Sequence, residues 1–218
     1  MNSILEKTRG GVGIYGGTFD PLHFGHINLA VNLMESCALE EIWFCPARIS
    51  PHKQDSTPTN SAHRLKMLEL ALKDIPEFKI LDIELQREGP SYTIDTIKEL
   101  LEKESKSLSP RQLHLIIGED ALSGLDRWHR VDEIVDTIPL LIGKRQGNDN
   151  FKFSSNQKIT DAISRGLVET PLMDISATQV RQRIKKDLYC GHLISHKVLD
   201  YIHQNDLYFI NPNNQLSS

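Results

Sequence analysis

Residues 14–26 read IYGGTFDPLHFGH, and this stretch decides the fold of the chain. An apolar run over residues 12–15 ends in two glycines, a turn built on Asp20 and Pro21 follows, and the apolar-periodic segment INLAVNLM begins at Ile27. A strand, a glycine turn and a helix N-terminus together form an arrangement that receives phosphate groups. The stretch therefore predicts an anion site at the start of a helix.

Two histidines, His23 and His26, stand three residues apart at this predicted helix start. Residues three apart share one face of a helix, so both rings can point at the ligand of the turn. Gly16 and Gly17 let backbone N–H groups approach that ligand, because they carry no Cβ. Zinc is the alternative ligand, but zinc needs a third and usually a fourth side chain. The sequence offers no Cys-x-x-Cys or His-Glu-x-x-His partner, so phosphate is favoured.

Residues 11–16, GVGIYG, also match the dinucleotide fingerprint GxGxxG, which would indicate an NAD-dependent oxidoreductase. That fingerprint should follow a strand and open a helix. Here its letters would form the strand itself, and Pro21 interrupts the continuation. We interpret the match as a coincidence.

The composition predicts a globular enzyme without nucleic-acid or membrane partners. The chain has 218 residues, of which 39% are hydrophobic and 25% charged, and its net charge is −4. A general nucleic-acid surface would be basic. No stretch approaches the roughly 18 apolar residues of a membrane span, and the N-terminus lacks the apolar core of a signal peptide. Three scattered cysteines (Cys37, Cys45 and Cys190) indicate a reducing compartment, so we expect a cytoplasmic location.

Apolar runs alternate with helical periods along the chain. We expect strands over residues 12–16, 42–45, 78–83, 113–117, 139–142 and 172–175, and helices over residues 27–37, 63–73, 94–104, 177–187 and 195–205. This alternation predicts a Rossmann-like, doubly wound α/β fold with a mostly parallel sheet, helices on both faces and a small C-terminal helical extension. We expect one domain over residues 11–210, with flexible tails at 1–10 and 211–218.

The second informative segment is DISATQVRQRI at residues 174–184. Ser176 and Gln179 form a capping box for a helix that starts near Ala177, which by itself explains the serine. Capping does not explain Arg181, which shares a helix face with Thr178. A helix N-terminus together with an arginine makes a second phosphate cradle.

These two segments resemble the signatures of the nucleotidylyltransferase superfamily, whose enzymes move a nucleoside monophosphate from a triphosphate onto an acceptor. Residues 17–26 match GTFDPxHxGH, and residues 175–181 match IS-x-T-x-x-R, in the same order along the chain. In the superfamily the second motif binds the triphosphate from the side opposite the histidines. The resemblance extends from Gly13 to about Phe209.

Further segments resemble the nicotinate mononucleotide branch of that superfamily. CPARISPHK at residues 45–53 is similar to its P…PPHK loop, with Ser50 in place of the first proline. The helix carrying Arg64 and the stretches at 87–97 and 116–131 also match the branch. One departure is His129, where the family often has an aromatic residue after the tryptophan.

The resemblance implies adenylyl transfer from ATP to nicotinate mononucleotide, giving nicotinate adenine dinucleotide and pyrophosphate, a step of NAD synthesis. It implies catalytic roles for His23, His26 and Arg181. The implied ATP ligands are Gly16, Gly17, Thr18, Phe19, His23, His26, Gly118, Asp120, Ser176, Thr178 and Arg181. The implied acceptor ligands are His52, Lys53, Thr93 and Trp128. We expect Mg²⁺ to sit mainly on the phosphates of ATP, because the sequence offers no clustered carboxylates for it.

Other interpretations remain open for single residues and for the activity. His52 and Lys53 could lie on a solvated charged loop, Thr93 could be a helix-start residue, and Trp128 could belong to the core or its rim. The acceptor could instead be nicotinamide mononucleotide, pantetheine phosphate, or an alcohol phosphate used with CTP. The chain could also be a regulator that binds nucleotide without turnover. The stretches at 87–97 and 116–131 argue against the pantetheine and CTP readings.

Overall fold

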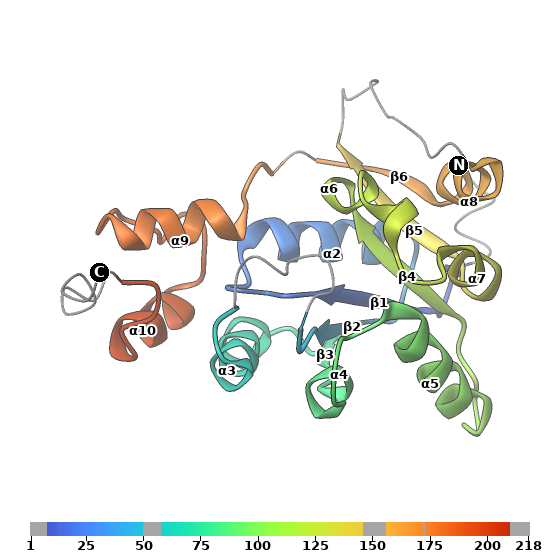
Figure 1. Ribbon diagram of the computed structural model, residues 1–218, viewed down its shortest axis with the longest axis horizontal. Coiled ribbons are helices and arrows are strands. Elements are labelled where there is room, and N and C mark those ends of the chain that lie inside the picture. The colour runs from blue at the N-terminus through green and yellow to red at the C-terminus, as the bar shows by residue number, and fades with distance from the viewer. Residues whose placement is uncertain (1–7, 50–57, 146–155, 172, 210–218) are drawn as a thin grey trace.

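The computed structural model describes residues 8–49, 58–145, 156–171 and 173–209 (Figure 1). These residues form a six-stranded sheet in the order β3-β2-β1-β4-β5-β6. Each neighbouring pair of strands is parallel, which confirms the predicted doubly wound sheet. The strands are β1 (Val12–Gly17), β2 (Glu41–Pro46), β3 (Phe78–Ile80), β4 (Leu113–Gly118), β5 (Leu140–Arg145) and β6 (Leu167–Thr170).

Helices connect the strands and follow the last of them (Figure 1). They are α2 (Phe24–Ser36), α3 (Ser61–Leu72), α4 (Ile83–Gln86), α5 (Thr93–Ser105), α6 (Glu119–Leu122), η1 (Leu125–Arg127), α7 (Val131–Thr137), α8 (Gln157–Gly166), α9 (Ala177–Lys185) and α10 (His196–Gln204). The chain builds outward from β1 to β3 and then returns to start the other half at β4. In such sheets ligands bind beyond the carboxyl ends of the strands where the order reverses, which here is between β1 and β4.

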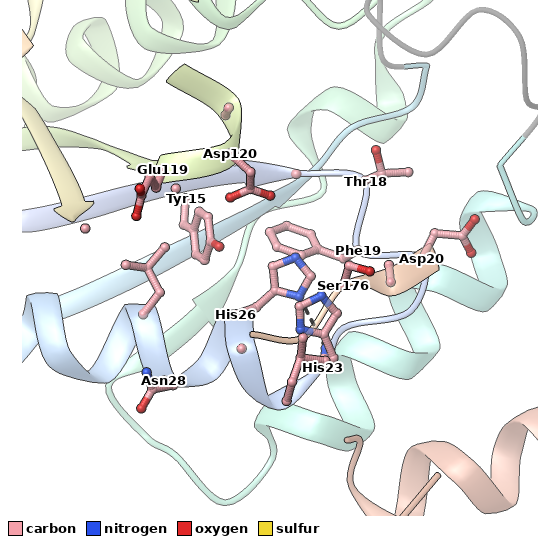
Figure 2. Close-up of a pocket in the computed structure, with 18 of the residues that line it drawn as sticks. Tyr15, Thr18, Phe19, Asp20, His23, His26, Asn28, Glu119, Asp120 and Ser176 are labelled. Carbon is pink, nitrogen blue, oxygen red and sulfur yellow. Dashed lines mark hydrogen bonds between the residues drawn. The ribbon is translucent and has the colours of Figure 1, made fainter. Parts of the chain in front are cut away.

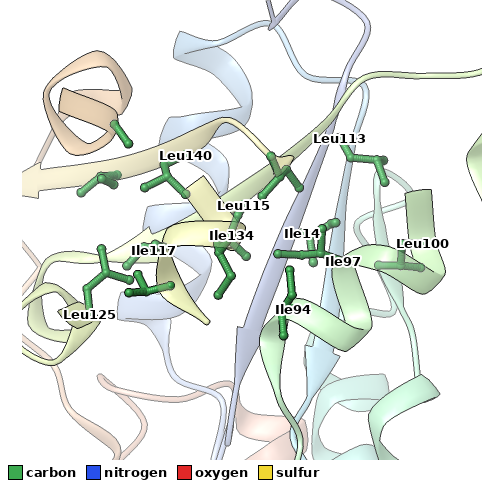
Figure 3. Packing of buried hydrophobic residues seen from close by; sticks show 14 of the residues in the cluster. Ile14, Ile94, Ile97, Leu100, Leu113, Leu115, Ile117, Leu125, Ile134 and Leu140 are labelled. Atoms are coloured by element: carbon green, nitrogen blue, oxygen red, sulfur yellow. The ribbon is translucent and has the colours of Figure 1, made fainter. Parts of the chain in front are cut away.

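Two buried clusters cover the two faces of the sheet. Leu115 and Ile117 of β4 pack with Ile97 of α5 on one face, which Figure 3 shows. Ile116 points to the other face and packs with Leu33 of α2. Successive residues of a strand alternate between faces, and both faces are covered by helices. A central strand that is buried on both faces is apolar at successive positions, which explains the continuous apolar run of β4 in the sequence.

The C-terminal helices α9 and α10 form the predicted extension. Their apolar faces, including Val180 and Ile202, pack in a third cluster together with Met67 of α3. Among the described helices, none combines the length and the apolarity that a membrane crossing needs.

Some expected elements are wrong. The last strand is β6 over Leu167–Thr170, and residues 173–175 are not in a strand. The helix α8 was not expected, although Ile159, Ala162 and Ile163 recur at helical spacing and are buried. The strand expected over 78–83 ends at Ile80, because the chain turns into the short helix α4 at Ile83.

Candidate active site

A cavity of about 400 Å³ lies at the carboxyl ends of β1 and β4, where the strand order reverses. Its walls come from the glycine turn, the start of α2, the start of α6 and the start of α9 (Figure 2). The cavity brings together most of the residues that the sequence singled out: Gly16, Gly17, Thr18, Phe19, His23, His26, Gly118, Asp120, Trp128, Ser176 and Arg181. Two motifs far apart in the sequence therefore border one space.

The two glycines of the turn differ in what they allow. A Cβ on Gly16 would meet no heavy atom within 4 Å, so the backbone of Gly16 borders open space in the cavity. A Cβ on Gly17 would lie 2.8 Å from the ring of Phe19. The first glycine leaves room for a ligand beside the backbone, and the second makes room for an aromatic ring below it.

His23 and His26 face one another at the start of α2. Their ring centroids are 3.7 Å apart with an interplanar angle of 27°. The N–H of His23, which is the N-cap residue, donates to Nδ1 of His26 over 3.3 Å. The ring of Phe19 packs edge-on against His26 at 5.2 Å. Helix α2 starts at Phe24, three residues before the expected position, so His26 lies in its first turn. In that turn the N–H of Phe24 donates to the carbonyl of Leu193 and the N–H of His26 donates to the carbonyl of His23, so the two imidazole rings are the groups this helix start offers to an anion.

Burial makes His23 a neutral side chain. It is 6% exposed, and this desolvation lowers its pKa to about 4, while the carboxylate of Asp120 acts in the opposite direction. Its Nδ1 is buried without a hydrogen-bond partner among the described residues. A buried polar atom without a partner has lost its contact with water and gained nothing in return. A phosphate oxygen entering the cavity would supply the missing partner once the ring is protonated.

Helix α9 contributes the second half of the site. It begins at Ala177 as predicted, and the hydroxyl of Ser176 accepts from the N–H of Gln179 over 3.1 Å. Arg181 donates through Nη1 to the carbonyl of Asp20 over 2.7 Å, and its Nη2 lies 3.3 Å from the hydroxyl of Thr178. Ser176 and Arg181 line the cavity, whereas Thr178 contacts Arg181 but does not line the cavity.

Arg64 does not line this cavity but supports the glycine turn, a role that was not predicted for it from the sequence. It is 1% exposed and donates to the carbonyls of Thr18 at 2.8 Å, Thr59 at 2.9 Å and Arg48 at 3.3 Å. It therefore ties three loops together beneath the glycine turn. The sequence carried a signal for this role, because Arg64 occupies the same face of α3 as buried Met67, where an exposed arginine would not be expected.

A second cavity of about 360 Å³ adjoins the first. Both cavities are bordered by residues 16–18, Asp120 and Trp128. Thr93 and His129 line the second cavity, and the ring of His129 packs on that of Tyr92 at 4.4 Å. The departure that His129 represents in the sequence therefore lies in the wall of this cavity.

A buried carboxyl group stands in the wall of the second cavity. Glu84 is 6% exposed, and burial raises the pKa of its carboxyl group, which hydrogen bonds with Thr96 and Ser91 oppose. The hydroxyl of Thr96 donates to Glu84 over 2.8 Å. The sequence reasoning did not single out this residue. His52 and Lys53, the remaining candidates, lie outside the described residues.

Within the described ranges, His, Cys, Asp and Glu side chains form no group of three or more that could hold a metal ion. Glu119 and Asp120 border the first cavity from the start of α6. Figure 2 shows both carboxylates on the side of the cavity that faces the histidine pair.

Comparisons with known proteins agree with this geometry. Residues 14–183 match the cytidylyltransferase-like family. The nicotinate-nucleotide adenylyltransferase of Bacillus subtilis (strain 168) is 38% identical over 197 residues, which covers 90% of this chain and 97% of that protein.

Solved structures share the fold at lower sequence identity. Plasmodium falciparum nicotinic acid mononucleotide adenylyltransferase complexed with NaAD has a TM-score of 0.70 at 19% identity and covers 92% of this chain and 98% of its own. The same enzyme complexed with APC has a TM-score of 0.68 with the same coverage and identity. The chain therefore belongs to the cytidylyltransferase-like family and, within it, to the nicotinate-nucleotide adenylyltransferases, which are nucleotidyltransferases of NAD biosynthesis.

Proposed function

We propose that this chain transfers the adenylyl group of ATP to nicotinate mononucleotide, releasing pyrophosphate and forming nicotinate adenine dinucleotide. The observation that carries the proposal is the pair of adjoining cavities that share residues 16–18, Asp120 and Trp128. One cavity has the features of a phosphate site and the other has aromatic and hydroxyl side chains suited to a ring. Two substrates bound there would meet at the glycine turn.

The chemical step needs positioning and charge stabilisation. An oxygen of the acceptor phosphate attacks the α-phosphorus of ATP, the bond from that phosphorus to the pyrophosphate oxygen breaks, and pyrophosphate leaves. The acceptor phosphate is already an anion, so no general base has to remove a proton. The barrier comes from repulsion between the two anions and from charge that builds on the leaving group.

We assign the ATP side to the first cavity. His23 and His26, at the N-terminus of α2, would contact the phosphates, and Gly16, Gly17, Thr18 and Phe19 would shape the turn beneath them. Arg181 and Ser176 at the start of α9 would hold the β- and γ-phosphates as they leave, and Thr178 would act through its contact with Arg181. Gly118 and Asp120 would border the adenosine. Support comes from the lining of the cavity and from the backbone of Gly16, where a ligand has room.

We assign the acceptor to the second cavity, with Thr93 and Trp128 at the pyridine ring. Thr93 is the first residue of α5, ahead of the N–H of Asp95, which donates to the carbonyl of Tyr92, so its backbone N–H and its hydroxyl are both donors at the helix start. Lys53 and His52 would hold or screen the acceptor phosphate. The N–H of Arg48 donates over 3.0 Å to the hydroxyl of Ser91, which lines the second cavity.

We propose that Mg²⁺ enters this site coordinated mainly by the phosphate oxygens of ATP. Both carboxylate oxygens of Asp20 accept hydrogen bonds within the protein, from Tyr208 and from the N–H of Thr59, so that side chain is occupied. Glu119 and Asp120 border the cavity and could reach water molecules of a hydrated ion. Bound there, Mg²⁺ would neutralise charge on the phosphates.

We further propose one catalytic domain over residues 11–210 and a cytoplasmic location. The three buried free thiols are suited to a reducing compartment of that kind.

Purified protein tests the proposal directly. With ATP, Mg²⁺ and nicotinate mononucleotide it should release pyrophosphate and form the dinucleotide in equal amounts. Parallel reactions with pantetheine phosphate, or with CTP in place of ATP, should give at most a small fraction of that rate. Folded protein that binds ATP but releases no pyrophosphate would mean that the chain is a nucleotide-binding regulator. Hydride transfer with NAD would instead favour the oxidoreductase reading of GVGIYG.

A further inference from the structure

The last described segment of the chain reaches back to the glycine turn. The hydroxyl of Tyr208, beyond α10, donates to Oδ1 of Asp20 over 2.6 Å, although the two residues are 188 positions apart. The other oxygen of Asp20 accepts from the N–H of Thr59 over 3.1 Å. Tyr208, Asp20 and Thr59 all line the first cavity. Both carboxylate oxygens are thus held by donors from other parts of the chain.

This arrangement reduces the repulsion between the carboxylate of Asp20 and the phosphates of ATP. Asp20 is 7% exposed and stands in the turn that leads into the histidine pair, where the phosphates of ATP would bind. A carboxylate aimed at that space would repel them, and the repulsion grows as water is excluded. Figure 2 shows the Asp20 carboxylate directed away from His23 and His26. The donors from Tyr208 and Thr59 hold it in that orientation and offset part of its charge.

The backbone around Tyr208 is held in an unusual conformation. Asp206 has φ 50° and Tyr208 has φ 69°, the left-handed region that bulky side chains rarely adopt. The N–H of Leu207 donates to the carbonyl of Ile202 over 3.0 Å, and the segment packs on the C-terminal apolar cluster. Backbone strain of this kind persists only where surrounding contacts determine it, and it gathers at functional sites.

Asp20 also links Tyr208 to the arginine of α9. While its carboxylate accepts from Tyr208, its main-chain carbonyl accepts from Arg181 over 2.7 Å. A shift of the Asp20 backbone would therefore disturb the guanidinium as well as the turn. Burial and the neighbouring Asp20 both raise the pKa of Tyr208, so its hydroxyl stays a proton donor at every pH at which the protein works.

We propose that Tyr208 is a positioning residue for adenylyl transfer, which holds Asp20 and through it sets the glycine turn and Arg181 for the triphosphate. This inference rests on the proposed function, because it concerns the ATP side of that reaction. The C-terminal segment then has a role beyond covering α3. It completes the phosphate site from the far end of the chain.

A matched pair of tyrosine variants tests the proposal. Tyr208→Phe removes the hydroxyl that holds Asp20. Tyr201→Phe removes a hydroxyl of the same C-terminal region, one that lies 2.8 Å from Nδ1 of His63 and outside both cavities. Hydrogen bonds to a charged group are worth enough to change an equilibrium roughly ten- to a hundredfold. We expect Tyr208→Phe to reduce kcat/KM for ATP by about that factor, with KM for nicotinate mononucleotide unchanged, and Tyr201→Phe to change neither.

A binding measurement and a second variant separate this inference from the proposed function. Calorimetry with an ATP analogue that has a methylene between the α- and β-phosphates reports the ATP side even without turnover. Tyr208→Phe should weaken that binding, and the effect should shrink in an Asp20→Asn background if it acts through Asp20. Equal values for Tyr208→Phe and Tyr201→Phe would overturn the inference. Parallel losses for both substrates together with a lowered Tm would overturn it too, because they would indicate general destabilisation. Wild-type protein without turnover would refute the function, and the analogue would still decide the role of Tyr208.

Discussion

Nη1 of Arg181 donates to the main-chain carbonyl of Asp20 over 2.7 Å, and this bond joins α9 to the glycine turn across 161 residues. A second contact, 3.3 Å from Nη2 to the hydroxyl of Thr178, also fixes the guanidinium. A planar guanidinium fixed at two points presents its remaining N–H groups in one orientation. Arg181 lines the first cavity, so the fixed guanidinium forms part of its wall.

Replacing Arg181 with lysine should therefore be costly even though the charge is kept. An ammonium cannot bond Asp20, Thr178 and a phosphate at once in a fixed geometry, so we expect Arg181→Lys to lower kcat roughly ten- to a hundredfold. The matched control is Arg183→Lys on the same helix, whose guanidinium donates to the carbonyl of Tyr189 over 2.9 Å outside both cavities. Steady-state kinetics on both variants check this. An unchanged kcat for Arg181→Lys would remove the arginine from the assigned role.

His26→Ala should lower kcat strongly while the fold survives. His26 lines the cavity and is held in place by Phe19, and loss of one preorganised donor costs roughly 3 to 4 kcal/mol in the transition state, at least about a hundredfold in rate. His192→Ala is the control, because that ring is exposed and packs on Tyr189 outside both cavities. Circular dichroism and kinetics decide the matter. An unfolded variant, or one with wild-type kcat, contradicts the assigned role of His26. Stoichiometric zinc in the wild-type protein would instead indicate that His23 and His26 bind a metal ion.

His23 should titrate near pH 4 in the free protein, since burial holds its pKa at about 4. The unfolded chain, with an ordinary histidine pKa of about 6.5, then binds more protons than the folded protein between these values. Stability therefore falls as pH decreases through this window, by about 2 kcal/mol between pH 7 and pH 5 for this one group. Denaturant unfolding at both pH values should show a smaller loss for His23→Asn than for wild type.

Direct titration gives a second readout for the same residue. Ring signals in NMR should report the low pKa of His23, and an ATP analogue should raise it, because phosphate stabilises the protonated ring. An ordinary pKa in the free protein would contradict the burial argument. An analogue that leaves the titration unchanged would mean that His23 does not contact the phosphates.

Parts of the site could be predicted because their chemistry is local. The glycine turn with His23 and His26 needs only a strand end and a helix start, and the cap at Ser176 needs only residues up to Gln179. Such features depend on neighbours within one helical turn, so the letters of the sequence are enough to indicate them.

Other parts could not be predicted, since they depend on contacts between distant segments. Nothing in the sequence near Tyr208 indicates that its hydroxyl meets Asp20, and nothing near Glu84 indicates that it stands in a cavity wall. The edge strand β6 over Leu167–Thr170 was missed for a different reason. It has a neighbour on one side and buries only Thr170, so its residues lack the apolar run of a central strand.

The second cavity makes a prediction about the acceptor. Nicotinate and nicotinamide mononucleotides differ in a carboxylate against an amide on the ring. The hydroxyl and the backbone N–H of Thr93, the first residue of α5, are donors, which suit a carboxylate, whereas an amide would present its own NH₂ against them. Hydrogen bonds to a charged group are worth roughly 1.5 to 3 kcal/mol, so we expect kcat/KM to favour the nicotinate form by at least about tenfold.

His129 is the residue that should limit this preference. It lines the same cavity, packed on Tyr92, and a neutral imidazole nitrogen can accept from the amide of nicotinamide. His129→Phe keeps an aromatic ring on Tyr92 and removes both nitrogens, so it should widen the preference for nicotinate. Thr93→Val keeps the shape of the side chain and removes the hydroxyl, so this variant should reduce the preference for nicotinate. Side-by-side kcat/KM values for the two acceptors at saturating ATP give the ratio for each protein. A wild-type ratio of one, or a preference for the amide, would mean that the acceptor specificity is wrong even if adenylyl transfer is right.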